Sequence, residues 1–264
     1  MDKLKFETPD MVSGNIDKIA VLFPSAITEM RGEDGEIKRG VNFEVLKQLL
    51  SRDVVDGDEC YEFTWVGKKA AMAEAARPIT KTLRPVKEDS RDWDTTENLY
   101  IEGDNLEVLK LLQESYLGKV KMIYIDPPYN TGNEKWVYND NVNDPHIKAW
   151  LGKVVGAEGE DLSRHDKWLC MMYPRLKLLQ KLMAEDGVIF ISIDDAEYAN
   201  LKLICDEIFG TNCFVSNISW QRTYSTRNDS KGIVNEVEHI LVYSKLPDWQ
   251  PSKLPRTAEM NSIY

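Results

Sequence analysis

Residues 120–132 read VKMIYIDPPYNTG, and the fold class follows from this segment. Residues 120–125 are apolar almost throughout, which predicts a strand buried inside a parallel sheet. Two prolines follow, and because proline has a fixed φ and no amide hydrogen, the strand must end in a stiff turn. Polar side chains directly after such a strand lie where open α/β sheets collect their ligands. The segment therefore predicts an α/β sheet with a site at the carboxyl end of this strand.

The chain on both sides of this segment alternates between predicted strands and helices. On the N-terminal side we expect a strand over 99–101 and a helix over 104–117, which Asp104 caps and Gly118 ends. On the C-terminal side we expect a long helix over 168–184, a buried strand over 187–193, a helix over 196–209, and strands over 214–220 and 237–243. Such alternation is typical of an α/β protein.

Residues 1–97 are predicted to form an N-terminal accessory region that ends in a linker. We expect, in chain order, a polar turn over 32–35, an amphipathic helix over 41–50, a strand over 62–66, an alanine-rich helix over 70–76 and an irregular linker over 82–94. The strand–helix alternation begins at residue 98. Residues 98–245 are therefore predicted to be the main domain, followed by a tail over 246–264.

The composition limits the classes of function. The chain carries 33 Lys and Arg against 44 Asp and Glu, a formal net charge of −11. A protein that grips duplex DNA by itself usually shows a basic footprint, so either this chain is not the part that grips DNA or its DNA contacts are few. No apolar run reaches the roughly 20 residues of a membrane span. Because the four cysteines form no Cys-x-x-Cys pair, we expect a cytoplasmic protein with no membrane partner and no metal site.

The turn after the strand carries groups that suit one kind of chemistry. The Asp126 carboxylate and the Pro127 carbonyl form an acceptor pair for the two hydrogens of an amino group. Tyr129 offers a flat face on which a base can stack. The alternative is a strand-ending turn with a packed tyrosine. The combination of Asp126, Pro127, Pro128 and Tyr129, followed by Asn-Thr-Gly, favours the functional interpretation.

This tetrapeptide resembles the signature of amino-group methyltransferases that depend on S-adenosylmethionine. The longer string over 98–133, NLYIEGDNLEVLKLLQESYLGKVKMIYIDPPYNTGN, resembles the modification subunits of type III restriction–modification systems. The similarity continues through 167–210, Trp220 and residues 238–243, and includes residues 65–69 more loosely. The resemblance implies a Rossmann-like methyltransferase sheet of the S-adenosylmethionine-dependent kind.

The resemblance also implies roles for individual residues. Asp126, Pro127, Pro128 and Tyr129 would be the catalytic residues that hold the target amino group and stack on the flipped base. Gly103, Asp104, Asn105 and Asp126 would contact the cofactor, S-adenosyl-L-methionine. Asp104 then has two interpretations, helix cap and cofactor contact. For Asp194 and Asp195 a helix cap and a functional role remain open.

The predicted function is site-specific methylation of adenine N6 in DNA, because relatives that methylate cytosine N4 mostly have Ser where this chain has Asp126. The predicted partners are DNA, a restriction subunit and a second copy of the chain. His239 lies within a predicted strand and is expected to be a satisfied core residue. Arg222 either contacts the DNA backbone or belongs to a solvated loop.

The sequence departs from the family in its glycines. No two of the 15 glycines are separated by a single residue, so the Gly-x-Gly turn of a cofactor loop is absent. The chain is therefore expected to be the N-terminal part of a longer enzyme, with residues 246–264 leading to a missing recognition region. We expect weak cofactor binding by this chain alone and one unpaired edge on strand 120–125. The alternative is an incomplete fragment that folds or dimerises without methylating.

Overall fold

The computed structural model describes residues 7–32, 35–50, 62–131, 161–224, 235–253 and 255, without the side chains of 161–164. The chain divides into two compact units. The first comprises Met1–Leu117 and Gly132–Lys181, and the second comprises Gly118–Thr131 and Leu182–Tyr264. No helix among the described residues is long and apolar enough to cross a membrane. The predicted domain boundaries at residues 97 and 245 stay predictions.

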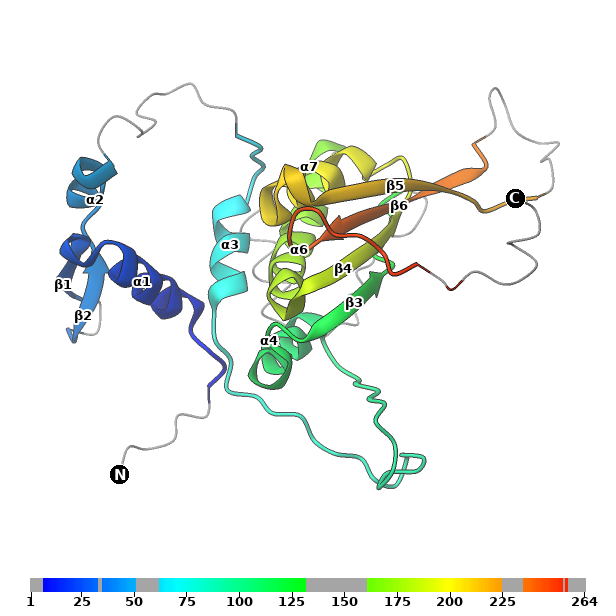
Figure 1. The fold of residues 1–264 in the computed structure, drawn as a ribbon, viewed down its shortest axis with the longest axis horizontal. Helices are drawn as coiled ribbons and strands as arrows, with labels where there is room; N and C mark the ends of the chain where they lie inside the picture. The colour runs from blue at the N-terminus through cyan, green and yellow to red at the C-terminus, as the bar shows by residue number, and fades with distance from the viewer. Residues whose placement is uncertain are drawn as a thin grey trace. The chain divides into compact units, whose positions relative to one another are not determined.

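The second unit is built on a four-stranded mixed sheet (Figure 1). Its strands are β3 (Val120–Ile125), β4 (Met183–Ile193), β5 (Phe214–Gln221) and β6 (Val237–Ser244), in the order β3-β4-β6-β5. β3 runs parallel to β4, and the other two pairings are antiparallel. The predicted α/β class and the four strands are confirmed. Among the described residues β3 has a neighbour on one side only, which confirms the predicted unpaired edge.

One face of this sheet forms the core of the second unit. Side chains alternate between the faces of a strand, and the set on this face is fully buried: Ile189, Ile191, Ile193, Leu241 and Tyr243. Helix α7 (Tyr198–Phe209), followed by the short turn η3 (Thr211–Cys213), contributes Leu201, Ile204 and Cys205 to the buried residues. The Tyr243 hydroxyl donates to Asp206 Oδ1 at 2.8 Å, which ties β6 to α7.

On the opposite face the two outer strands carry exposed side chains, whereas Val188, Ser192 and Val242 of the central strands are buried. Met122 is 61% exposed, Tyr124 56% and Trp220 56%. The expectation that 120–125 is buried throughout is therefore wrong, since Ile123 is the only buried residue of this strand. The apolar pattern of this strand did predict its parallel pairing, but not that one of its faces would lack a covering layer.

Three predicted elements have different bounds in the structure. Helix α6 spans Asp161–Leu182 and β4 begins at Met183, whereas we expected a helix over 168–184 and a strand from 187. β4 starts early because its pairing with β3 is irregular. Val120 of β3 pairs with Met183, but Met122, two residues later, pairs with Val188, five residues later on β4. α7 begins at Tyr198 instead of residue 196, after a turn in which Asp194 accepts the amide hydrogen of Ala196 at 2.9 Å.

Gly187 sits in this irregular pairing, and its substitution gives a first test. A Cβ atom there would lie 2.9 Å from the carbonyl oxygens of both Ala184 and Val120. Because both are backbone atoms, Gly187→Ala should lower the free energy of unfolding by about 1–3 kcal/mol, as measured by urea denaturation. Gly14→Ala is the control, since nothing lies within 4 Å of its Cβ position; it should stabilise the helix over Met11–Leu22 by about 0.5–1 kcal/mol. Equal effects would contradict the close approach.

The first unit contains five further helices and a hairpin in its described part: α1 (Met11–Leu22), η1 (Pro24–Ala26), β1 (Ile27–Arg31), β2 (Ile37–Val41), α2 (Phe43–Leu50), α3 (Lys68–Ala76) and α4 (Asn105–Tyr116). The predicted helices over 41–50, 70–76 and 104–117 are confirmed within a few residues. α1 and the β1–β2 hairpin were not predicted. Of the predicted polar turn over 32–35, residues 33 and 34 lie outside the described residues, and the Gly35 amide donates to the Gly32 carbonyl between the two strands.

Two predicted strands of the first unit do not form among the described residues. In segment 62–66, Trp65 is buried against Phe63 and Tyr173, with ring centroids 5.4 and 5.7 Å away, and its indole donates to Cys170 Sγ. Leu99 and Tyr100 are 68% and 94% exposed, with no neighbouring strand. A β-prone segment becomes a strand only where another backbone pairs with it, and none does so here.

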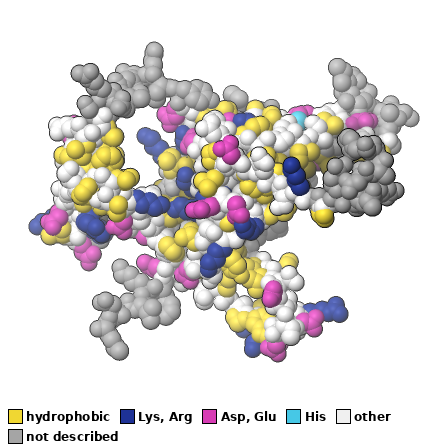
Figure 2. Space-filling model, viewed as in Figure 1, with side chains coloured by type: hydrophobic (Ala, Val, Ile, Leu, Met, Phe, Trp, Pro, Cys, Tyr) yellow, Lys and Arg dark blue, Asp and Glu magenta, His cyan; other side chains and the backbone are white. Residues whose placement is uncertain are grey.

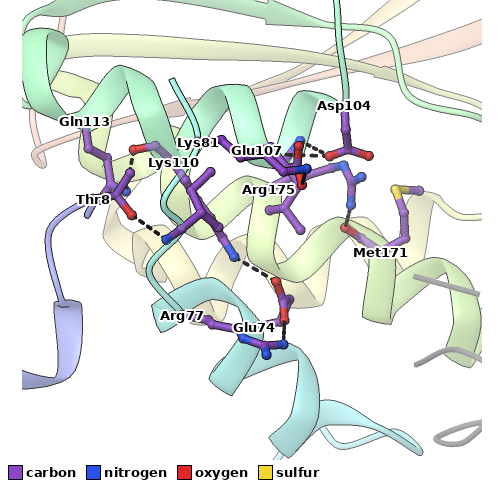
Figure 3. A network of polar contacts seen from close by, with 12 residues as sticks. Thr8, Glu74, Arg77, Lys81, Asp104, Glu107, Lys110, Gln113, Met171 and Arg175 are labelled. Carbon is purple, nitrogen blue, oxygen red and sulfur yellow. Dashed lines mark hydrogen bonds and ion pairs between the residues drawn. The ribbon is translucent and has the colours of Figure 1, made fainter. Parts of the chain in front are cut away.

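Helix α4 is held by a network of polar contacts (Figure 3). Asp104 caps it by accepting from the amides of Leu106 and Glu107, as predicted. Lys110, only 2% exposed, forms an ion pair with Glu74 of α3 at 2.7 Å. The start of α4 is therefore fixed by both its own cap and its neighbours.

Candidate functional site

The predicted reaction centre lies in the second unit, directly after β3. Asp126 and Pro128 are exposed, Pro127 and Tyr129 are partly buried, and Asn130 is buried. β4 runs parallel to β3, so its end at Ile193 and the following Asp194 lie at the same edge of the sheet. β6 is antiparallel, and its first residues therefore reach this edge too, with His239 opposite Ile193. The topology thus gathers polar side chains from three strands at one edge.

Tyr129 faces two carboxylates at this edge. Its hydroxyl lies 3.5 Å from Glu238 Oε2 on β6, and Asp126 is also within hydrogen-bonding reach. Burial raises the pKa of Tyr129 well above its ordinary value, and the hydrogen bond to Asp126 and the charges of Asp126 and Glu238 raise it further. The phenol is therefore neutral at physiological pH. It acts here as a hydrogen-bond donor and an aromatic surface, not as a base.

Glu238 is itself held by Arg222, which follows β5. Arg222 Nη1 lies 3.3 Å from Glu238 Oε1, and the Arg222 amide donates to the Glu236 carbonyl at 2.9 Å. Arg222 was predicted to contact DNA or to lie in a solvated loop. No role was predicted for Glu238, and its ion pair with Arg222 was not predicted either. No sequence signal marks Glu238, because the pairing depends on how β5 and β6 bring the two residues together.

The end of the loop is anchored by a buried clamp. The Asn130 side-chain amide donates to Glu197 Oε1, and Glu197 Oε2 accepts from the Asn200 amide at 2.8 Å. Asn130 and Glu197 are both fully buried. Asn130 has a φ of 60°, a conformation that asparagine tolerates better than most residues. The clamp connects the residue after Tyr129 to the start of α7, and no sequence pattern indicated a role for Glu197.

Asp194 and Asp195 have different surroundings. Asp194 closes the turn before α7 instead of capping the helix itself, and burial raises its pKa. Asp195 Oδ1 pairs with His239 Nε2 at 2.9 Å. His239 Nδ1 lies 3.1 Å from the Asn217 amide nitrogen, so both ring nitrogens have partners. The prediction of a satisfied histidine is confirmed, although His239 is only partly buried.

The predicted cofactor residues Gly103, Asp104 and Asn105 lie at the start of α4, in the first unit. Gly103 has a φ of 151°, and a Cβ atom there would be in ordinary van der Waals contact with Val108, 3.7 Å away. Asp104 is partly buried and uses Oδ1 for the helix cap, whereas Asn105 accepts from Arg175 at 2.7 Å. A carboxylate and an amide at a helix start fit the charged amino-acid end of S-adenosyl-L-methionine.

Comparison with known proteins identifies the family. The model of the DNA methylase family matches residues 120–260. The chain therefore belongs to the DNA methylase family.

Within this family the chain is similar to modification subunits. It is 39% identical over 227 residues to the Mod subunit of the type III restriction–modification enzyme StyLTI of Salmonella typhimurium. The alignment covers 81% of this chain and 34% of that protein. It is also 39% identical over 214 residues to the EcoP15I Mod subunit of Escherichia coli, covering 76% and 33%. The predicted resemblance is confirmed. The chain spans about a third of the length of these relatives.

Two more distant similarities complete the comparison. The type II methyltransferase M.KpnI of Klebsiella pneumoniae is 37% identical over 151 residues, covering 57% of this chain and 33% of that protein. The solved PvuII DNA methyltransferase (cytosine-N4-specific) aligns with a TM-score of 0.35 and 16% identity over 55% of this chain and 48% of its own. We draw nothing from a structural likeness of that level.

Proposed function

We propose that this chain carries the reaction centre of a site-specific DNA methyltransferase that methylates adenine at N6, as the modification part of a restriction–modification system. The observation that carries the proposal is the Asp126–Tyr129 turn. This turn directly follows β3, in the part of the chain that matches the DNA methylase family. Asp126 is exposed there, and Tyr129 lies close to it. The similarity to Mod subunits supports the restriction–modification context.

The residues of the turn have distinct roles in this proposal. The Asp126 carboxylate and the Pro127 carbonyl accept the two hydrogens of the adenine amino group. Holding both hydrogens draws the nitrogen lone pair out of conjugation with the ring and makes it available as a nucleophile. Pro128 stiffens the turn, and Tyr129 stacks on the base. Since the amino group is out of reach inside a duplex, the base must first be flipped out of the helix.

S-adenosyl-L-methionine supplies an electrophilic methyl group when it is bound. We propose that Asp104 and Asn105 hold its amino-acid end, where the carboxylate of Asp104 accepts hydrogen bonds from the ammonium group. Gly103 gives the ligand room to approach the backbone, and Asp126 borders the methyl group. Asp104 would then serve both as helix cap and as cofactor contact.

DNA, a restriction subunit and a second copy of the chain are the proposed partners. The similarity to modification subunits of restriction–modification enzymes supports the first two. The unpaired edge of β3 supports association between copies, because such an edge offers unsatisfied backbone groups to another chain. On the face in Figure 2, Lys and Arg side chains are interspersed with Asp and Glu. Because the basic side chains do not form a separate patch on this face, we expect the described residues there to make few contacts with DNA phosphates.

Transfer of a labelled methyl group tests the proposal. The complete natural protein should move the label from S-adenosyl-L-methionine to unmodified DNA. The same DNA, once fully methylated by the protein, should take up no further label, which serves as the control. Label in protein or RNA instead of DNA, or none in any acceptor, would contradict the proposed function.

The present chain alone should bind S-adenosyl-L-methionine weakly, with a dissociation constant above the micromolar range. Asp104 and Asn105 offer contacts to one end of the cofactor only. The adenosine end needs a glycine turn that lets the backbone come close, and the sequence has no Gly-x-Gly. Isothermal titration calorimetry measures this directly. Micromolar binding by the isolated chain would show that the adenosine is held in some other way.

A further inference from the structure

Two neighbouring side chains at the start of α4 present groups of opposite hydrogen-bonding character. Asp104 accepts the amide hydrogens of Leu106 and Glu107 with one oxygen, Oδ1, at 2.9 and 3.2 Å, so Oδ2 keeps its acceptor capacity for a ligand. Asn105 is exposed and accepts from Arg175 Nε with its Oδ1 at 2.7 Å, so the nitrogen end of its amide faces away from Arg175. The start of α4 therefore offers a ligand an acceptor on one residue and a donor on the next.

Arg175 determines which end of the Asn105 amide faces it. A guanidinium group donates hydrogen bonds and accepts none, so the carbonyl oxygen of Asn105 must turn toward Arg175 and the nitrogen away from it. Arg175 is itself held in place, because it is 7% exposed and its Nη1 donates to the carbonyl of Met171, on the same helix α6, at 2.7 Å (Figure 3). All three residues belong to the first unit. The direction of an exposed amide is thus fixed by a buried side chain.

We propose that Arg175 is a positioning residue, which turns the Asn105 amide so that its nitrogen donates to the carboxylate of S-adenosyl-L-methionine. This inference rests on the proposed function, in which Asp104 and Asn105 hold the amino-acid end of the cofactor, and deepens it. That end carries an ammonium group, which donates hydrogen bonds, and a carboxylate, which accepts them. Asp104 Oδ2 matches the ammonium group and Asn105 Nδ2 matches the carboxylate. The partial positive charge at the start of a helix favours the carboxylate there as well.

The test compares two ligands of the complete natural protein by isothermal titration calorimetry. S-adenosyl-L-homocysteine carries the amino-acid end of the cofactor, whereas its decarboxylated analogue, S-adenosyl-3-thiopropylamine, keeps the ammonium group and lacks the carboxylate. Asn105→Asp retains an acceptor for Arg175, so the contact between α4 and α6 is preserved, but it replaces the donor with a negative charge. It should weaken the binding of S-adenosyl-L-homocysteine about 10- to 100-fold and should not weaken the binding of the analogue.

A double-mutant cycle isolates the positioning by Arg175. Arg175→Met leaves the Asn105 amide free to rotate and should weaken S-adenosyl-L-homocysteine about three- to tenfold more than the analogue. In the Asn105→Ala background no amide remains to be turned, so Arg175→Met should no longer distinguish the two ligands. Glu114→Gln, at an exposed position farther along α4, is the control and should leave both affinities unchanged.

The outcomes separate this inference from the proposed function. Equal affinities of the wild-type protein for both ligands, or an Asn105→Asp variant that weakens both ligands equally or neither, would overturn the inference. So would an effect of Arg175→Met on discrimination that persists in the Asn105→Ala background. If Arg175→Met does not fold, Asn105→Asp still distinguishes a donor to the ligand from a tie between two helices. A wild-type protein that binds neither ligand would contradict the proposed function itself.

Discussion

Asp126→Ala should lower the rate of DNA methylation by about a thousandfold or more in the complete natural protein, a loss typical of removing a group that stabilises the reacting atoms. The alanine leaves one hydrogen of the target amino group without its acceptor, so the nitrogen lone pair stays conjugated with the adenine ring. Asp126 is exposed and supports no part of the core. The loss should therefore appear in the rate of the chemical step and not in the unfolding free energy.

The control for this substitution is Asp186→Ala in the same unit. Asp186 is also exposed, and its ion pair with Lys121 lies at the surface, where such pairs contribute little. Its variant should methylate at the wild-type rate. Wild-type turnover by Asp126→Ala in a single-turnover assay would refute the assignment of the reaction centre, and so would an equal loss in both variants.

Glu197→Ala should lower the free energy of unfolding by about 2–4 kcal/mol, because the buried amide of Asn130 and the partly buried amide of Asn200 both lose this acceptor. It should also slow methylation, since the residue after Tyr129 loses its anchor on α7. The unfolding free energy of Glu197→Gln should lie between those of the wild type and Glu197→Ala, because its single carbonyl oxygen can accept from only one of the two amides. Urea denaturation measures the stability of all three proteins.

Glu207→Ala on the same helix is the matched control, since Glu207 is exposed. Its unfolding free energy should stay within about 0.5 kcal/mol of wild type. If Glu197→Ala were as stable as Glu207→Ala, the clamp would have no structural role, and the Asn130 conformation would need another cause.

The parts of the fold that sequence predicted best are those fixed by strong local signals. The apolar run of 120–125 and the double proline predicted the strand and the position of the site. Asp104 and Gly118 predicted both ends of α4, because caps are formed by residues next to the helix. These features depend on neighbours in the chain, and a single sequence is sufficient to identify them.

The parts that sequence did not predict depend on contacts between distant residues. Segment 99–101 has the composition of a strand but finds no pairing partner in the described structure. Glu197 and Glu238 lie 67 and 109 residues from the loop residues that they contact. No spacing rule relates such residues, so their roles appear only once the sheet is assembled. The same holds for the irregular pairing of β3 and β4, which moved the start of β4 to Met183.

The identity of the methylated base tests the central claim most directly. Unmodified DNA is treated with the complete natural protein and S-adenosyl-L-methionine, digested to nucleosides and analysed by mass spectrometry, with Asp126→Ala treated in parallel. The proposed function predicts N6-methyladenine with the wild-type protein and none above background with the variant. N4-methylcytosine in place of N6-methyladenine, or N6-methyladenine at equal levels with both proteins, would contradict it.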